Sequence, residues 1–152
     1  MKNLHFVSLF VFVCFMQTIT CAQNPIMIKD TAGQKFLIDS LVKTIDDNYD
    51  ILHSDFTPSV HKLSTMGIPA IEAVLPLLNS SKEDTRLHAQ RVVEGVIYRM
   101  NGFVPGQGFT TKGGEEKSRE ILNSIEYDWE GIDLKNRQNA IENLKKWISK
   151  NK

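Results

Sequence analysis

The chain has 152 residues, and its 18 lysine and arginine residues balance 18 aspartate and glutamate residues. This balance excludes a strongly basic nucleic-acid-binding arm and an acidic tail as dominant features. Both cysteines, Cys14 and Cys21, lie within the first 22 residues. A chain processed near Gln23 therefore has no thiol for a disulfide, a cysteine-based zinc site or a nucleophile.

Residues 1–22 have the pattern of an export signal. A positive start precedes the apolar run 6–16, and small Thr20 and Ala22 stand at the −3 and −1 positions of a cleavage site. An uncleaved membrane anchor fits less well, because a bilayer span needs roughly 20 apolar residues. A lipid anchor on Cys21 is a second alternative, but threonine directly before that cysteine fits a lipoprotein signal poorly. We expect an exported, periplasmic or secreted protein with no membrane insertion after cleavage.

The rest of the chain has the length of one domain of about 100–150 residues. Residues 23–33 show no sustained period and are expected to form a lead-in segment. Residues 34–152 are expected to form a single helical-repeat domain. A chain of this size buries about two thirds of its extended surface, which suffices for one core.

The first predicted helix covers about residues 34–53. Its apolar stripe recurs at spacings of three and four and consists of Ile38, Leu41, Val42, Ile45, Tyr49 and Leu52. The acidic residues of this segment are interpreted as a solvated outer face: Asp39, Asp46, Asp47 and Asp50.

Two shorter helices are predicted next. Thr57 as an N-cap and Pro58 at the first helical position indicate a helix over about 58–66. Pro69 opens the following helix in the same way. Pro76 lies inside that helix, so we expect a kink or an early end near residue 75.

A strong helix follows, for which Ser80 and Glu83 form a predicted capping box. Its buried stripe consists of Ala89, Val92, Val93, Val96, Ile97 and Met100. The polar residues expected to face mostly away from the core are Arg86, Gln90, Arg91 and Glu94. The helix is expected to end at Asn101 and Gly102.

Glycines and the absence of a period predict a loop over 103–114. Two further helices are predicted over about 115–127 and 134–150. No run of residues alternates as a strand would. The fold class is therefore all-α, with about five helices after the signal.

Residues 67–101 contain a recognisable pattern of small, apolar and charged positions: Gly67, Ala70 and Ile71, Leu77 and Leu78, Asp84, Arg86, and Ala89. The pattern resembles a HEAT repeat of the short, phycobilisome-lyase-like kind. The resemblance implies a HEAT/armadillo-like α-solenoid, here a small right-handed stack of antiparallel helix pairs. Pro76 departs from the family pattern, and only one clear unit is found. Since one unit cannot bury its own face, either the flanking helices are degenerate repeats or the resemblance is local.

Motifs that carry chemistry are absent from the sequence. The histidines after the signal are His53, His61 and His88; no His-x-x-x-His pair occurs, so we assign them polar surface or capping roles. The stretch 106–114 lacks the Gly-Lys-Ser/Thr order of a phosphate loop, and no Gly-x-Ser-x-Gly motif occurs. We expect no catalytic residue, no metal, no cofactor and no enzymatic activity.

The remaining candidate for function is the loop 103–114. Phe103, Gln107 and Phe109 are predicted to contact a partner, because aromatic side chains on loops are common binding anchors. The alternative is that both rings fold back onto the end of the bundle. The sequence favours an exported, non-enzymatic protein that binds an unidentified protein and no nucleic acid. The alternatives are a cell-envelope enzyme accessory and a toxin-neutralising immunity-type protein.

Overall fold

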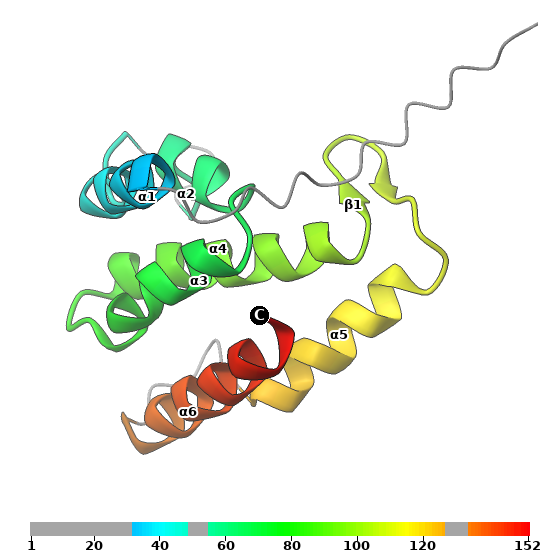
Figure 1. Cartoon of the computed structure of the whole chain (residues 1–152). Helices are drawn as coiled ribbons and strands as arrows, with labels where there is room; N and C mark the ends of the chain where they lie inside the picture. Colours follow the sequence, from blue (N-terminus) through cyan, green and yellow to red (C-terminus); the bar gives the residue numbers. More distant parts are fainter. Residues whose placement is uncertain (1–31, 49–54, 127–133) are drawn as a thin grey trace, which may run out of the picture.

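The computed structural model describes residues 32–48, 55–126 and 134–152 (Figure 1). The predicted signal at 1–22, residues 23–31 of the predicted lead-in, Tyr49, Leu52 and His53 lie outside these residues. The lead-in prediction is wrong for Ala32 and Gly33, which begin the first helix. The described elements are helices α1 (Ala32–Lys43), α2 (Pro58–Leu63), α3 (Ile68–Val74), the 3₁₀ helix η1 (Leu75–Asn79), α4 (Glu83–Met100), α5 (Gly114–Ile125) and α6 (Leu134–Asn151), with strands β1 (Phe103–Val104) and β2 (Gly108–Phe109). The all-α fold class is confirmed, and the two strands form one short hairpin.

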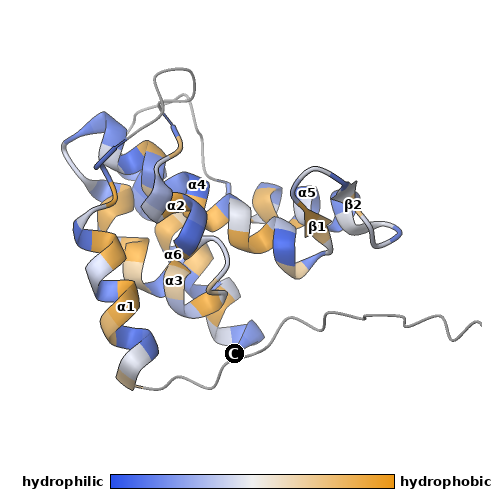
Figure 2. Ribbon diagram, turned by 90° about the horizontal axis from the view of Figure 1, so that it is seen from above, coloured by the Kyte–Doolittle hydropathy of each residue, from blue (hydrophilic) through white to orange (hydrophobic). Residues whose placement is uncertain are grey.

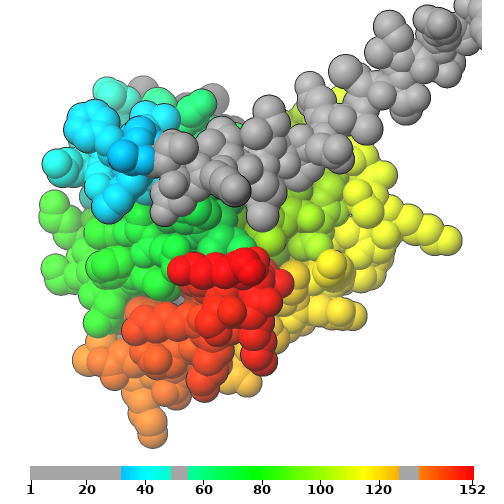
Figure 3. Space-filling view, viewed as in Figure 1, coloured from blue at the N-terminus to red at the C-terminus, as the bar shows by residue number. Residues whose placement is uncertain are grey.

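The helices lie in three tiers (Figure 1): α1 with α2, then α3 and η1 with α4, then α5 with α6. Helix α4 is central and packs against α2, α3, η1 and α5. Figure 3 shows α6, in orange and red, against the green middle tier and the yellow α5. The fully buried large side chains that join the tiers are Val60, Leu63, Ile71, Val74, Leu78, Val92, Val96, Ile97 and Leu144. Apolar stripes of separate helices thus form one core.

Helix α1 ends earlier than the apolar spacing predicts. It stops at Lys43, and residues 44–48 form turns, so the prediction of a helix through 44–48 is wrong. The hydroxyl of Thr44 reaches the carbonyl oxygens of Ser40 and Leu41, each at 3.3 Å, and lies 2.8 Å from the Ser59 hydroxyl of α2. Asn48 adopts a left-handed φ of 56°. These polar bonds stop the helix although Ile45 continues the apolar stripe and is buried.

The proline and capping predictions in the next segment are confirmed. The Thr57 hydroxyl accepts the Val60 N–H at 3.1 Å and donates to the carbonyl of Ile45 at 2.9 Å. Pro58 occupies the first turn of α2. Helix α3 ends at Val74, and Pro76 lies in the first turn of η1. The missing N–H of a proline costs nothing at that position, so the chain tightens into 3₁₀ geometry instead of breaking.

Several predictions for α4 are wrong. The N-cap is Lys82, not Ser80, because Ser80 already closes η1 and its hydroxyl accepts the Lys82 N–H at 3.2 Å. Met100 is 46% exposed, although the stripe predicts it to be buried. Gln90 is buried rather than facing solvent.

Candidate functional site

Residues 103–109 form a two-stranded hairpin where the sequence predicts only a loop. Phe103 pairs with Phe109, and Val104 pairs with Gly108. The turn is closed by the Gln107 N–H, which donates to the carbonyl of Val104 at 3.0 Å. Pro105 precedes Gly106, whose φ is 79°. This order suits a type II turn, which needs a positive φ at its third position. Strands of two residues are too short to show a period of two.

The aromatic residues of the hairpin pack onto the last turns of α4. The ring centroids of Phe103 and Phe109 are 5.3 Å apart, and those of Tyr98 and Phe109 are 5.6 Å apart, both edge-to-face. Tyr98 also lies 6.0 Å from Phe103. Burial raises the pKa of the Tyr98 phenol, and the charge of Glu94 acts in the same direction. Both phenylalanines are half-buried.

The opposite side of the hairpin faces outward. Side chains alternate along a strand, so Val104 lies on the face away from Phe103, and its cross-strand neighbour Gly108 has no side chain. Val104 is 37% exposed, and Gln107 in the turn is exposed as well. Figure 2 shows the hairpin and the start of α5 projecting sideways from the part of the molecule that contains α1, α2 and α3.

The base of the hairpin is tightly packed. The carbonyl of Gly102 accepts both the N–H and the hydroxyl of Thr110, each at 2.9 Å. Gly102 has a φ of 90°, and a Cβ there would collide with Thr111. A Cβ on Gly114 would collide with the carbonyl oxygen of Asn101. Two glycines therefore let α4, the hairpin and α5 meet at close range, which fixes the direction in which the hairpin projects.

A second polar cluster joins the turn after α1 to α4. Asp46 lies 2.8 Å from His88 Nδ1 and accepts the Thr85 hydroxyl at 2.5 Å. Burial acts to raise the pKa of Asp46, but the hydrogen bonds from His88 and Thr85 and the neighbouring basic groups of His88 and Lys82 outweigh it and lower the pKa below its ordinary value. An ionised carboxylate only accepts hydrogen bonds. His88 Nδ1 is therefore the donor to Asp46.

This cluster corrects two sequence predictions. The side chain of His88 is 2% exposed, so it is not a surface histidine, and Asp46 is not part of a freely solvated face. The burial of His88 could have been predicted from the sequence, because Thr85 and His88 extend the apolar stripe of α4 one turn toward its start. Since His88 is closed off from solvent, the cluster anchors the turn after α1 to α4.

Arg91 of α4 makes a third set of contacts. Its guanidinium bonds Asp55 and Glu94, each at 2.7 Å, and lies 5.7 Å from the centroid of the Phe56 ring. Burial acts to lower the pKa of Arg91, but these two carboxylates outweigh it and raise the pKa. The Phe56 ring stacks on His61 at 5.1 Å. Arg91 is thus half-buried, contrary to the expectation that it faces away from the core.

Within 32–48, 55–126 and 134–152, no three His, Cys, Asp or Glu residues lie together as metal ligands would. Over the same residues, no helix has the length and apolar character that crossing a membrane requires. Among the residues that the sequence singles out, the structure brings Phe103 and Phe109 together and places Gln107 at the turn between them.

Comparisons with known proteins find no relative of this chain. No family model matches the chain, and no curated protein or solved structure matches it significantly.

Proposed function

We propose that this chain is an exported, non-enzymatic helical-repeat protein that binds a protein partner through the hairpin 103–109. In this proposal Gln107 and Val104 make the outward contact, and the half-buried Phe103 and Phe109 lie beside it. The single observation that carries the proposal is the hairpin itself. It projects from the helical tiers, is held at its base by close packing, and presents an exposed apolar side chain beside an exposed amide.

A preorganised hairpin suits binding because ordering a loop at an interface costs free energy. Here the aromatic contacts of Phe103 and Phe109 with Tyr98 supply that order within the free protein.

The repeat part of the proposal draws on the three tiers. The HEAT-like residues 67–101 correspond to α3, η1 and α4, which form the middle tier. The outer tiers, α1 with α2 and α5 with α6, would then be degenerate repeats that cover the two faces of the middle pair. In this arrangement the tiers form a small right-handed solenoid of antiparallel helix pairs.

Photo-crosslinking from the hairpin tests the binding proposal. A photoreactive residue replaces Gln107 in one variant and Ser124, an exposed residue of α5, in a matched control. We expect a discrete adduct with one protein from position 107 in the producing cells and none from position 124. The absence of an adduct at 107, or the same adducts from both positions, would contradict the proposal.

The identity of the crosslinked protein separates the alternatives stated above. An envelope enzyme as the adduct would favour an accessory role. A secreted toxin would favour an immunity-type protein.

A further inference from the structure

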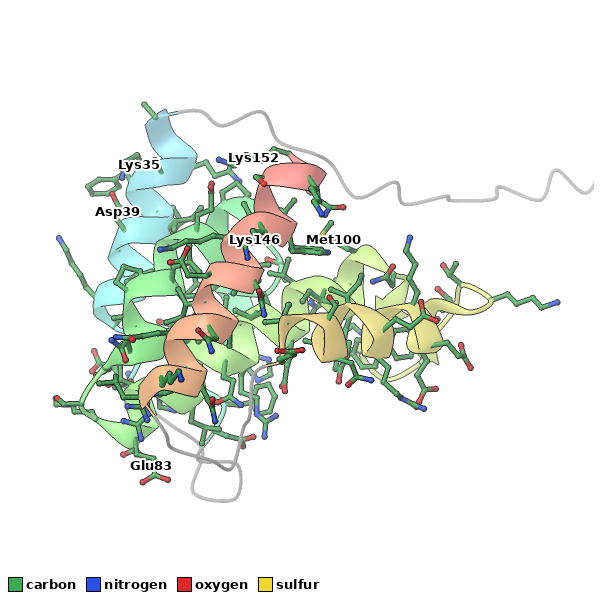
Figure 4. All side chains as sticks on the ribbon, turned by 90° about the horizontal axis from the view of Figure 1, so that it is seen from below. Lys35, Asp39, Glu83, Met100, Lys146 and Lys152 are labelled. Atoms are coloured by element: carbon green, nitrogen blue, oxygen red, sulfur yellow. The ribbon has the colours of Figure 1, made fainter. Side chains whose placement is uncertain are left out.

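An Asn-Gly pair lies where α4 meets the hairpin, and the sequence contains no other. Asn101 follows the last residue of α4, and Gly102 precedes β1. Asparagine is chemically labile, and it deamidates most readily before glycine, because glycine has no side chain to shield its nitrogen. Figure 4 labels Met100, the residue directly before this pair, where the projecting part of the molecule leaves the helical tiers.

Deamidation joins two groups of this pair. The backbone nitrogen of Gly102 attacks Cγ of Asn101 and loses its proton to water. The new C–N bond replaces the bond to the side-chain nitrogen, which leaves as ammonia. Water then opens the cyclic imide at one of its two carbonyl groups. The product is aspartate, or isoaspartate, in which the backbone runs through the former side chain.

The folded structure keeps the two reacting groups apart. The ψ of Asn101 is 19°, so the Gly102 nitrogen is nearly eclipsed with the backbone nitrogen of Asn101 and lies away from its Cβ. Hydrogen bonds hold both groups in these positions. Asn101 Nδ2 donates to the carbonyl of Ile97 at 2.8 Å, and the Gly102 N–H donates to the carbonyl of Arg99 at 3.1 Å. Asn101 is also only 7% exposed, which limits the access of water.

Formation of the imide therefore requires the junction to open. The last turn of α4 must unwind to free the Gly102 N–H and to rotate ψ of Asn101. This rotation moves the hairpin, because the carbonyl of Gly102 accepts the N–H and the hydroxyl of Thr110. The hairpin is held on α4 by the contacts of Phe103 and Phe109 with Tyr98. These aromatic contacts thus oppose the reaction.

The product cannot restore the junction. A carboxylate only accepts hydrogen bonds, so at position 101 it would face the carbonyl of Ile97 without a donor between them. A buried charge without a partner is costly. Isoaspartate in addition lengthens the backbone by one atom. The carbonyl oxygen of Asn101 already lies so close to α5 that Gly114 has no room for a Cβ.

We propose that Asn101 and Gly102 form a deamidation site that the docked hairpin keeps closed, and that conversion of this site releases the hairpin from α4 irreversibly. The same contacts that order the hairpin then set the lifetime of its surface. This inference goes beyond the binding function proposed above, and its test needs no partner.

Incubation in heavy-oxygen water, followed by peptide mass spectrometry, measures the conversion of each asparagine. In urea, Asn101 should convert faster than Asn79 and Asn123, each of which precedes a serine. In the folded protein the rate at Asn101 should be at least about tenfold lower than in urea, since only the opened fraction reacts.

Two variants test whether the hairpin controls the reaction. Phe109→Ala should raise the rate at Asn101 in the folded protein by about fivefold or more, because it removes aromatic contacts that hold the hairpin. Phe36→Ala removes an exposed ring from α1 and should leave the rate unchanged. Equal rates at Asn101 in the folded and unfolded protein, or an unchanged rate in Phe109→Ala, would overturn the inference.

The consequence of conversion is tested with Asn101→Asp. Hydrogen exchange of the amides in 102–110 should become faster, while α2 stays protected. Asn123→Asp adds the same charge at an exposed position of α5 and is the matched control. If Asn101→Asp does not fold, the converted fraction of aged wild-type protein supplies the same measurement. Unchanged exchange of the hairpin amides after conversion would overturn the release of the hairpin.

Discussion

Replacing Gly95 by alanine should destabilise the protein even though alanine is the better helix former. Gly95 lies in the interior of α4, where the intrinsic gain from alanine is about 1 kcal/mol. A Cβ at this position would lie 2.5 Å from the Ser64 hydroxyl and 2.7 Å from the Ser64 Cβ. The Ser64 side chain is itself held, because it is buried and its hydroxyl donates to the carbonyl of Val60 at 2.8 Å.

The size of the effect follows from these two opposing contributions. Turning the hydroxyl away would not be enough, since the Ser64 Cβ is also too close. Helices α2 and α4 must therefore separate slightly, and such overpacking costs about 1–3 kcal/mol. After subtracting the helix-forming gain, the free energy of unfolding should fall by about 1 kcal/mol. For a domain of this size the melting temperature would fall by roughly 4 °C.

Urea unfolding followed by circular dichroism at the helical minimum measures this change. Gly33→Ala is the matched control, because nothing lies within 4 Å of a Cβ at that position in α1. The control should be neutral or slightly more stable than the wild type. The double variant Gly95→Ala/Ser64→Gly should be more stable than the two single changes predict, because the clash is removed. If Gly95→Ala is as stable as Gly33→Ala, then α2 and α4 do not approach as closely as described, and the reasoning is refuted.

Three further predictions concern the polar and aromatic contacts of the core. Thr57→Ala should cost about 2 kcal/mol in urea unfolding, because it removes an N-cap and leaves a buried carbonyl unpaired; Thr65→Ala, which loses only an exposed bond, should change stability by less than about 0.5 kcal/mol. Asp46→Asn should destabilise at pH 7. Since the folded-state pKa of Asp46 is lowered, its contribution to stability is present above the unfolded pKa of about 3.9 and is lost as the pH falls through the folded value. The difference in the free energy of unfolding between the variant and the wild type should therefore shrink below about pH 4. A difference that stays constant down to that pH would show that the carboxylate of Asp46 does not stabilise the fold. Phe109→Ala should speed hydrogen exchange of the amides in 102–110 while leaving α2 protected, and unchanged exchange would show that the ring does not hold the hairpin.

Features that depend on neighbours in the chain could be predicted from the sequence. The all-α class, the N-cap at Thr57 and the early end of α3 before Pro76 all result from interactions within one helical turn. The buried stripes of α4 and α6 follow from a spacing of three and four, which is also local. Each of these features is decided by backbone geometry and side-chain preference over a few residues.

Features that depend on distant residues were missed or misplaced. The sequence assigns Asp46 to a solvated face, but its partner His88 is 42 residues away along the chain. The end of α1 at Lys43 similarly depends on the contact of Thr44 with Ser59 in another helix. The hairpin at 103–109 is held by Tyr98 and by the close approach of α5, neither of which a two-residue strand can reveal.

The sequence alone therefore determined that the chain is helical, where most of its helices begin, and which sides of them are apolar. Only the tertiary structure decided which polar residues are buried, where α1 stops, and how the aromatic hairpin is oriented. The physical reason is the separation along the chain over which each interaction acts. Hydrogen bonds within a turn and helical periodicity act between residues close in sequence, whereas burial of a charge or a ring depends on which distant helix covers it.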